Sequence, residues 1–533
     1  MTYSDGSVRT YPLIHPSVTL TGGGTEETGE GFELKVGWTE EGVTLESTLT
    51  YSVRPAVLTL RFGEGTWRPE EGSEGVDSYA AEITDSLTDL SVYEPTPSGE
   101  GKIFAGWFYD TALTERVIYR IEGHIFTRTD VTVYAGYDVD YTGTFNYEID
   151  HETGEATLTS YVDFDTTELV VPATVELYPV TAIGDEFCPE YFSIFFSVKS
   201  LRFAEGSRVE SIGEKAFLNV GSLTSVDLPE GLSVIGKSAF SGAGIRGEVR
   251  IPASVRRIES RAFAQCTFIT GFVFPADSRA LYFGDEAFSY CVAMTRFAMP
   301  DGLTECGKDI FTYCSDLSEI YIGDSLRTLG VRPFYGSDKL CAINVSPANQ
   351  YYTAIDGCIY SKDMSQLVLY NHKLTDAVYT VPDGVKTICE SAFDLSDGLS
   401  TSLKEIVLPE GLIRIYDNAF RNCAATFVLP SSLTSLSGYA FFGWKGRSFS
   451  LSSENADFAV RDGVLYSKDL KTLVCVPEGY ERTEYVLPDS VETVRTGALI
   501  GCSATEFIRI GRDSNLTVSY THLRAHETRS NLV

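Results

Sequence analysis

The chain has 533 residues, which is long enough for several average domains or for one array of repeats that grows in one dimension. Its hydrophobic content of 43% excludes a disordered chain. With 42 basic and 74 acidic residues the net charge is −32, which makes nucleic acid and a bare anionic membrane poor partners, because both bind through Lys and Arg. No apolar run approaches the length of about 18 residues that a transmembrane helix needs, so no direct membrane insertion is expected.

Residues 1–50 are predicted to be an incomplete or linker β-rich segment. The start, "MTYSDGSVRTYPLIHPS", lacks both the basic region and the apolar region of a secretion signal. Two interpretations stay open, a cytosolic protein or a sequence that begins inside a longer one, and we expect the second. The sequence itself is then expected to carry neither the signal peptide nor the anchor.

Residues 51–138 are predicted to form a separate small module. "FAGWFYDTALTERV" is followed by "DVTVYAGYD", which together span Phe104 to Asp138, and "AVLTLRFGEG" near 56–65 supplies an earlier strand. These stretches resemble a Listeria-Bacteroides repeat of the internalin B-repeat type. The resemblance implies a small β-grasp fold, although the acidic loop at 68–100 is longer than in the family's pattern.

The dipeptide Ala-Phe and its variants recur at a nearly fixed spacing further along the chain. The positions are Phe217, Phe240, Phe263, Phe288, Phe311, Phe334, Phe393, Phe420, Phe441 and Leu499. The first five intervals are 23, 23, 25, 23 and 23 residues, and Phe187 marks an earlier, atypical turn. Such a period indicates a repeat array in which each unit buries its apolar side against its neighbours.

Each repeat carries one phrase, seen in "SLTSVDLPEGLSVIGKSAF" at 222–240. Val226 and Leu228 point to the same side of an extended strand, and Pro229 ends that strand because it donates no ladder hydrogen bond. A Gly turn, a second apolar pair and the Ala-Phe turn follow. Over residues 139–510 we therefore predict a mainly β solenoid, with a parallel sheet on one face and short helical or irregular turns on the other.

Two longer intervals contain nearly identical segments, "DGCIYSKDMSQLVLY" from Asp356 and "DGVLYSKDLKTLVCV" from Asp462. Asp-Gly and Ser-Lys-Asp are both turn formers, so each segment is predicted to be a β-hairpin inserted in the solenoid, near 348–372 and 455–478. We interpret the duplication as scaffold, with a docking edge as the alternative. Residues 511–533 break the pattern and are predicted to be a non-repeat tail, which resembles a sequencing artefact or is an ordinary disordered end.

The phrase L-P-x-G-L-x-x-I-G-x-x-A-F-x-x-C, with its "DGVLYSKD" variants, resembles the BspA-like leucine-rich repeats of bacterial surface proteins, over roughly residues 141–510. This resemblance implies a leucine-rich-repeat solenoid. Together with the N-terminal module, it implies a position on the outside of a bacterial cell and adhesion to a host or neighbouring-cell surface protein or glycan.

Two motifs that suggest chemistry have structural explanations that we favour. "GLSVIGKS" at 231–238 fits a phosphate-binding loop, but Val234 and Ile235 are the apolar pair that every repeat needs for its core. The eleven cysteines include no C-x-x-C pair. Five of them follow the repeat's aromatic or Leu position by three residues and are predicted to be small buried core residues: Cys266, Cys291, Cys314, Cys423 and Cys502.

Histidines for catalysis or metal binding are scarce, whereas carboxylates are abundant, so a glycosidase-like acid pair stays open although no repeat nominates one. His372 is the only histidine between 152 and 510, and we expect an exposed loop histidine there rather than a general base. Asp163 and Asp165 are too few to form a calcium loop. No catalytic residue, cofactor or metal is predicted, and the chain is not expected to be an enzyme.

One residue of each repeat strand is predicted to face outward between two buried neighbours, so that these residues form a continuous exposed strip. The candidate partner-binding residues on it are Arg250, Val273, Ala298, Tyr321, Asn344, Val407 and Val428. The alternative is that they reflect only the β-propensity of a strand. The sequence thus predicts a non-enzymatic, adhesin-like cell-surface protein. Alternatives are a passive stalk or surface-layer component, or the non-catalytic part of a larger surface enzyme.

Overall fold

The computed structural model describes most of the repeat region and part of what precedes it. The described residues are 18–21, 29–40, 43–53, 57–66, 75–76, 78–82, 90–98, 100–113, 116, 131–193, 195–395, 402–499, 507–511 and 516. They belong to two compact units. Unit 1 is Met1–Asp140 with Val175–Leu177, and unit 2 is Tyr141–Thr174 with Tyr178–Val533.

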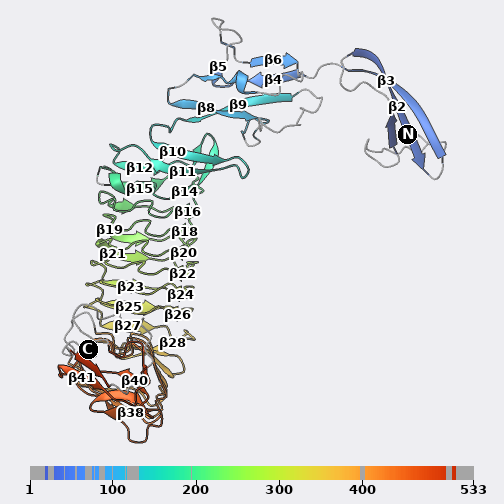
Figure 1. Cartoon of the computed structure of the whole chain (residues 1–533). Coiled ribbons are helices and arrows are strands. Elements are labelled where there is room, and N and C mark those ends of the chain that lie inside the picture. The colour runs from blue at the N-terminus through green and yellow to red at the C-terminus, as the bar shows by residue number, and fades with distance from the viewer. Residues whose placement is uncertain are drawn as a thin grey trace. The chain divides into compact units, whose positions relative to one another are not determined.

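Unit 1 contains two main sheets (Figure 1). The first is antiparallel, with strands β1 (Val18–Thr21), β2 (Gly29–Glu40) and β3 (Val43–Val53). The second has the order β6-β4-β9-β8, with β4 (Val57–Arg61), β6 (Ser78–Glu82), β8 (Lys102–Phe108) and β9 (Val131–Val139). The short strands β5 (Gly65–Thr66) and β7 (Thr96–Pro97) pair, and a 3-10 helix, η1, spans Leu90–Tyr93.

The second sheet of unit 1 buries Leu60, Phe62, Trp107 and Val133 completely, and the Phe62 and Trp107 rings meet edge-on at 5.6 Å. Strand β4 lies within the stretch predicted as the module's first strand. Part of the acidic loop at 68–100 lies outside the described residues, and the assignment of this unit to the Listeria-Bacteroides type stays a prediction.

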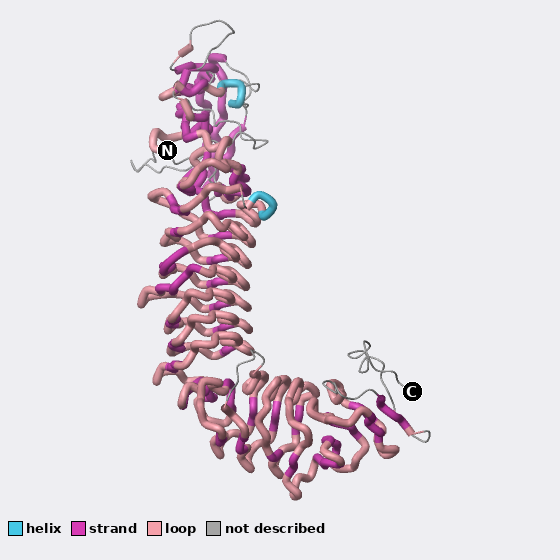
Figure 2. Tube along the Cα trace, turned by 90° about the vertical axis from the view of Figure 1, so that its left-hand side faces the viewer, coloured by secondary structure: helices cyan, strands magenta, loops and turns pink. Residues whose placement is uncertain are grey.

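Unit 2 is a solenoid with two lines of parallel strands, which run down its two sides in Figures 1 and 2. The first line, the strip ladder, contains the first strand of each repeat, which in most repeats is followed by a proline. Its strands are β12 (Glu168–Val171), β15 (Ser200–Phe203), β17 (Ser225–Val226), β19 (Arg246–Arg250), β21 (Phe268–Val273), β23 (Arg296–Ala298), β25 (Glu319–Ile322), β27 (Ala342–Val345), β31 (Val378–Thr380), β33 (Glu405–Val407), β35 (Val428–Leu429), β37 (Ser450–Leu451), β41 (Glu484–Leu487) and β43 (Phe507–Ile510).

The second line, the pair ladder, is formed by the second apolar pair of each repeat. Before the first inserted hairpin its strands are β14 (Tyr178–Ile183), β16 (Ser211–Ile212), β18 (Val234–Ile235), β20 (Arg257–Ile258), β22 (Tyr282–Phe283), β24 (Glu305–Cys306) and β26 (Thr328–Leu329). After it they are β30 (Gln366–Leu369), β32 (Thr387–Ile388), β34 (Arg414–Ile415), β36 (Ser435–Leu436), β40 (Thr472–Cys475) and β42 (Thr493–Val494). The short elements β13 (Thr174–Val175) and η2 (Glu190–Phe192) complete this region.

The mainly β solenoid predicted from the sequence is confirmed. The prediction of a sheet on one face only is wrong, because the second apolar pair also forms a parallel ladder and regular strands line both sides. The residues that the structure describes contain 3-10 helices but no α-helix, and among them no helix is long and apolar enough to cross a membrane.

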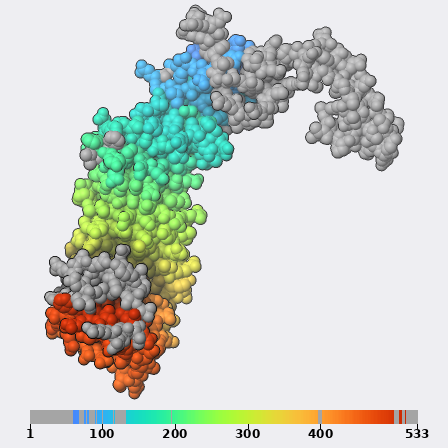
Figure 3. All heavy atoms as spheres, viewed as in Figure 1, coloured from blue at the N-terminus to red at the C-terminus, as the bar shows by residue number. Residues whose placement is uncertain are grey.

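The recurring Phe of each turn forms two stacks inside the solenoid, one before and one after the first inserted hairpin. From Phe217 to Phe334 consecutive rings lie 5.2, 5.3, 6.1, 5.7 and 5.8 Å apart and are nearly parallel. Phe393, Phe420 and Phe441 continue the pattern at 5.3 and 5.7 Å. Phe187, the atypical earlier turn, packs edge-on against Phe217. Each turn therefore buries its ring against its neighbours, as a repeat array requires, and the colour of unit 2 changes gradually along the array in Figure 3.

Both duplicated segments form antiparallel strands. The first has β28 (Tyr352–Ile355), β29 (Cys358–Ser361) and β30, and the second has β38 (Phe458–Arg461), β39 (Val464–Ser467) and β40. The last strand of each segment then joins the pair ladder.

The contacts inside the two segments are also equivalent. Ser361 Oγ donates to Asp363 at 2.6 Å and accepts the amide of Gln366 at 2.9 Å. Ser467 Oγ makes the same two hydrogen bonds, since it donates to Asp469 at 2.6 Å and accepts the amide of Thr472 at 2.8 Å. The duplication therefore repeats a structural frame.

Candidate binding surface

The strip ladder brings the predicted partner-binding residues together in three groups rather than one. Arg250 pairs with Val273, and Ala298, Tyr321 and Asn344 follow one another in register across β23, β25 and β27. Within the described residues, the hydrogen-bonded ladder is interrupted between β17 and β19, between β21 and β23, after β27 and after β37.

A third group of predicted residues follows the first inserted hairpin. The bridge between Glu405 and Thr426 sets a register that places Val407 beside Val428. These two side chains are 40% and 57% exposed. They form a small apolar patch on the strip ladder.

Most of the predicted residues are exposed, as an outward strip requires. Tyr321, at the centre of the three-residue group, keeps 37% of its surface accessible, whereas Ile320 and Ile322 on either side are fully buried. Val273 differs, because it is half-buried. The alternation along the strands was correctly predicted, and what the strip binds stays a hypothesis.

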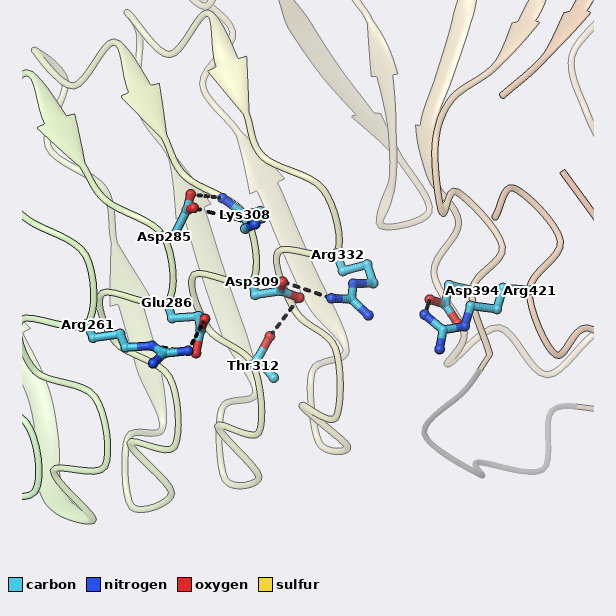
Figure 4. Close-up of polar contacts among 9 residues, drawn as sticks. All are labelled: Arg261, Asp285, Glu286, Lys308, Asp309, Thr312, Arg332, Asp394 and Arg421. Atoms are coloured by element: carbon cyan, nitrogen blue, oxygen red, sulfur yellow. Dashed lines mark hydrogen bonds and ion pairs between the residues drawn. The ribbon is translucent and has the colours of Figure 1, made fainter. Parts of the chain in front are cut away.

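Ion pairs connect adjacent turns beside the Phe stack (Figure 4). Arg261 reaches Glu286 of the next turn at 2.7 Å, and Arg332 reaches Asp309 of the preceding turn at 2.9 Å. Most such pairs are exposed and contribute little to stability. They show which charges of this surface are already neutralised by a neighbour.

A row of tyrosines on the turns was not predicted from the sequence. Tyr290 and Tyr313 follow the repeat's Phe by two residues, remain 41% and 37% exposed, and have ring centroids 4.8 Å apart. Tyr335 continues the row at 5.3 Å from Tyr313. The signal in the sequence is the recurrence of Tyr after "AFS" and "IFT".

The cysteines at the recurring position are buried, as predicted. Cys266, Cys291 and Cys314 are inaccessible, and each Sγ–H donates to the carbonyl oxygen of the Phe one repeat earlier, at 3.1, 3.3 and 3.1 Å. Burial raises the pKa of the Cys266 thiol to about 12, so the reactive thiolate is disfavoured. Cys266, Cys291 and Cys314 form no disulfide, and Cys502 lies outside the described residues.

The expectation of an exposed loop histidine is wrong. His372 is half-buried, its Nε2 is shielded from solvent, and it lines a small cavity of about 30 Å³ together with Tyr370. The reason is that the loop after β30 folds back: Tyr370 N donates to Ala392 O at 2.9 Å, and Asn371 Nδ2 donates to Asp356 O at 3.1 Å.

The two carboxylates considered for calcium do not form a ligand set. Asp163 accepts the amides of Asp165 and Thr166 at 2.9 and 3.2 Å, and the Thr166 hydroxyl, so it closes its own turn. Over the described part of the chain, no group of three or more His, Cys, Asp or Glu side chains could hold a metal ion.

A larger cavity, of about 310 Å³, lies where the pair ladder reaches the first inserted hairpin. Arg327 and Arg332 line it from the last regular turns, Tyr351 and Tyr352 from the start of the hairpin segment, and Glu390 from the turn beyond. No sequence motif predicted it.

The family of the chain follows from the repeats. The model of the BspA type leucine rich repeat region matches in six copies, over residues 186–282, 247–364 and 362–475, which together exceed half of the chain. The chain belongs to this family. No match was found among curated proteins.

Several solved structures are similar to the chain. A leucine rich cell surface protein from Faecalibacterium prausnitzii A2-165 is 23% identical, with 71% of this chain and 97% of that chain covered and a TM-score of 0.48. A leucine-rich repeat protein from Eubacterium ventriosum is 20% identical (70% and 91% covered, TM-score 0.41), and the pneumococcal vaccine antigen PcpA is 17% identical (71% and 93% covered, TM-score 0.42). At these identities and TM-scores the similarities carry no argument about function.

Proposed function

We propose that the chain is a non-enzymatic, adhesin-like protein of the bacterial cell surface, which binds a protein or glycan partner through the strip ladder. The observation that carries the proposal is the central group of that ladder. Ala298, Tyr321 and Asn344 lie in register on one exposed line, with a tyrosine in the middle. Tyr is enriched at protein interfaces because its ring is large and rigid and its hydroxyl forms hydrogen bonds.

The location is supported by the family. The repeats of this chain resemble the BspA-like leucine-rich repeats of bacterial surface proteins. The low proportion of basic residues fits a chain that does not bind nucleic acid. The partner is expected to be a surface protein or glycan of a host or neighbouring cell.

The absence of catalysis is part of the proposal. Among the cysteines, Cys266 and Cys423 are buried and their pKa is raised by that burial, to about 12 and about 11, which removes them as nucleophiles near neutral pH. His372, the one histidine of the repeats, lines a cavity with room for about one water molecule. Neither arrangement supplies a positioned nucleophile and base.

The first prediction concerns Tyr321. The full chain is tested for binding to extracellular-matrix proteins and to a glycan array, beside Tyr321→Asp and Tyr321→Ala. We expect saturable binding that both substitutions weaken at least about tenfold, because truncating a central aromatic contact costs about 2 kcal/mol.

Thr493→Asp is the matched control, because Thr493 is an exposed strand residue of the pair ladder, on the other side of the solenoid. It should leave binding unchanged. Equal binding by folded wild-type protein and both Tyr321 variants would remove the strip as the binding surface.

A further inference from the structure

The pair ladder is interrupted at the first inserted hairpin. Up to β26 each two-residue strand pairs with the next, but β26 and β30 belong to different sheets. Tyr352 compensates at the edge of β26: its hydroxyl donates to Arg327 O at 2.9 Å and accepts the Leu329 amide at 3.1 Å. A side chain therefore occupies part of the place of the missing strand, and the cavity of about 310 Å³ lies beside it.

The lining of this cavity combines aromatic, cationic and polar groups. Tyr351 is 44% exposed and lines the cavity, as does Tyr352. Gln366 and Glu390 supply hydrogen-bonding groups from the opposite side of the interruption. The volume is at the lower end of the range of about 300–1,000 Å³ found for small-molecule sites.

The two arginines of the cavity differ in what neutralises them. Arg332 is paired with Asp309 at 2.9 Å (Figure 4). Its guanidinium also packs over the Tyr335 ring. Arg327 is exposed and has no ion pair or side-chain hydrogen bond within the described residues. In a chain with a net charge of −32, an unpaired guanidinium at a cavity favours the binding of a ligand that carries an anionic group.

The second inserted hairpin provides an internal comparison. Asn455 corresponds to Asn349, because its Nδ2 donates to Leu433 O as that of Asn349 donates to Leu326 O. The alignment that follows places Thr434, Tyr439, Asp457, Phe458 and Thr496 where the first junction has Arg327, Arg332, Tyr351, Tyr352 and Glu390. The two junctions share the hydrogen bonds of the asparagine, but all five cavity residues of the first junction are replaced in the second.

The second junction is also closed by backbone contact. A Cβ on Gly438 would lie 2.4 Å from Thr496 O, and one on Gly497 would lie 2.6 Å from Gly438 O. Val331 and Ser391 are the corresponding residues of the first junction, and both line the open cavity. The cavity is therefore not a necessary consequence of inserting a hairpin.

We propose that the first junction is a binding site for an acidic sugar unit, of the uronic or sialic acid type. The sugar's carboxylate pairs with Arg327, its C–H face packs on the exposed Tyr351 ring, and its hydroxyls bond to Gln366 and Glu390. A neutral sugar leaves the Arg327 guanidinium without an anionic partner. A basic or purely apolar ligand does not use it at all.

The proposal of this site depends on the proposed function in one respect only, because that function places the chain where cell-surface glycans occur. It shares no residue with the strip ladder group around Tyr321, so the two can fail separately. Loss of one by substitution should leave the other intact.

The test measures binding of N-acetylneuraminic acid, glucuronic acid and, as the neutral comparison, glucose to the full chain by saturation-transfer NMR and calorimetry. We expect at least one acid to bind with a dissociation constant in the millimolar range. Arg327→Gln should weaken it at least about tenfold, as expected for a lost charged hydrogen bond. Tyr351→Ala should weaken it as well.

Thr434→Ala, at the corresponding position of the second junction, is the control and should change nothing. Binding of neither acid, equal binding of glucose, or binding that is unaffected by Arg327→Gln in the folded protein would overturn the proposal. Since Arg327 is exposed, its replacement should not disturb folding, and the far-ultraviolet spectrum checks this.

Discussion

Two buried asparagines fix the entry of the chain into the inserted hairpins. Asn349 Nδ2 donates to Gly323 O at 2.7 Å and Leu326 O at 3.2 Å, and its Oδ1 accepts the amides of Tyr351 and Tyr352, both at 2.8 Å. Asn455 makes the corresponding bonds in the second segment. One side chain thus satisfies backbone groups of two successive turns, which would otherwise be buried without partners.

Asn349→Ala is predicted to destabilise the first junction by about 2–3 kcal/mol, because it leaves buried backbone groups unsatisfied. Hydrogen exchange measures this directly: the amides of Tyr351 and Tyr352 should lose protection. Gln350→Ala is the control, since Gln350 is exposed and bonds only to Ala348 O. Unchanged exchange at the two tyrosines would show that the asparagine is not needed there.

At the scale of elements, the first turn of each hairpin depends on two residues with left-handed backbone. Asp356 and Gly357 have φ of 51° and 75°, and Asp462 and Gly463 have 51° and 82°. Positive φ at both positions is typical of the two-residue turn that matches the twist of antiparallel strands. The Asp-Gly dipeptide therefore predicted the turn correctly in both copies.

Gly357→Ala is predicted to destabilise the first hairpin by more than about 1 kcal/mol. An alanine at this position would have to keep an unfavourable positive φ, and its Cβ would lie 2.5 Å from Asn371 Nδ2. Thermal melting monitored by circular dichroism should show the loss. Gly384→Ala is the matched control, because its φ is not positive and its new Cβ would have Met364 O as nearest neighbour, at 3.7 Å. Equal effects of the two substitutions would contradict this explanation.

Over the whole molecule, the regular part of the fold could be read from the sequence and the irregular part could not. The Phe period, the prolines and the duplicated Asp-Gly turns reflect local backbone geometry. The same geometry recurs along the chain, so it can be predicted from the sequence. The cavity depends instead on which residues meet at the junction between β26 and β30, such as Arg327 and Glu390, which no single repeat contains. The burial of His372 was missed for the same reason, since its loop is packed by residues of a later turn.

The N-terminal end of unit 2 is closed by an antiparallel hairpin, β10 (Phe145–Asp150) and β11 (Glu155–Tyr161). Strand β11 pairs in parallel with β14, and Phe145 stacks on Phe187 with ring centroids 6.1 Å apart. Its outward residues are polar or exposed, as in Asn146 and Glu148. The hairpin therefore acts as the cap that a repeat array needs at its end.

Because each turn contacts mainly its neighbours, damage to this cap should stay local. Phe145→Ala is predicted to cost about 3–5 kcal/mol, as for other buried Phe residues, and to speed amide exchange in β11, β14 and β16 while β32 to β36 keep their protection. Asn146→Ala, on the exposed side of the same strand, should have little effect. A uniform loss of protection throughout unit 2 would instead mean that the solenoid unfolds as one cooperative body, because the stacked Phe rings then transmit the change beyond the nearest turns.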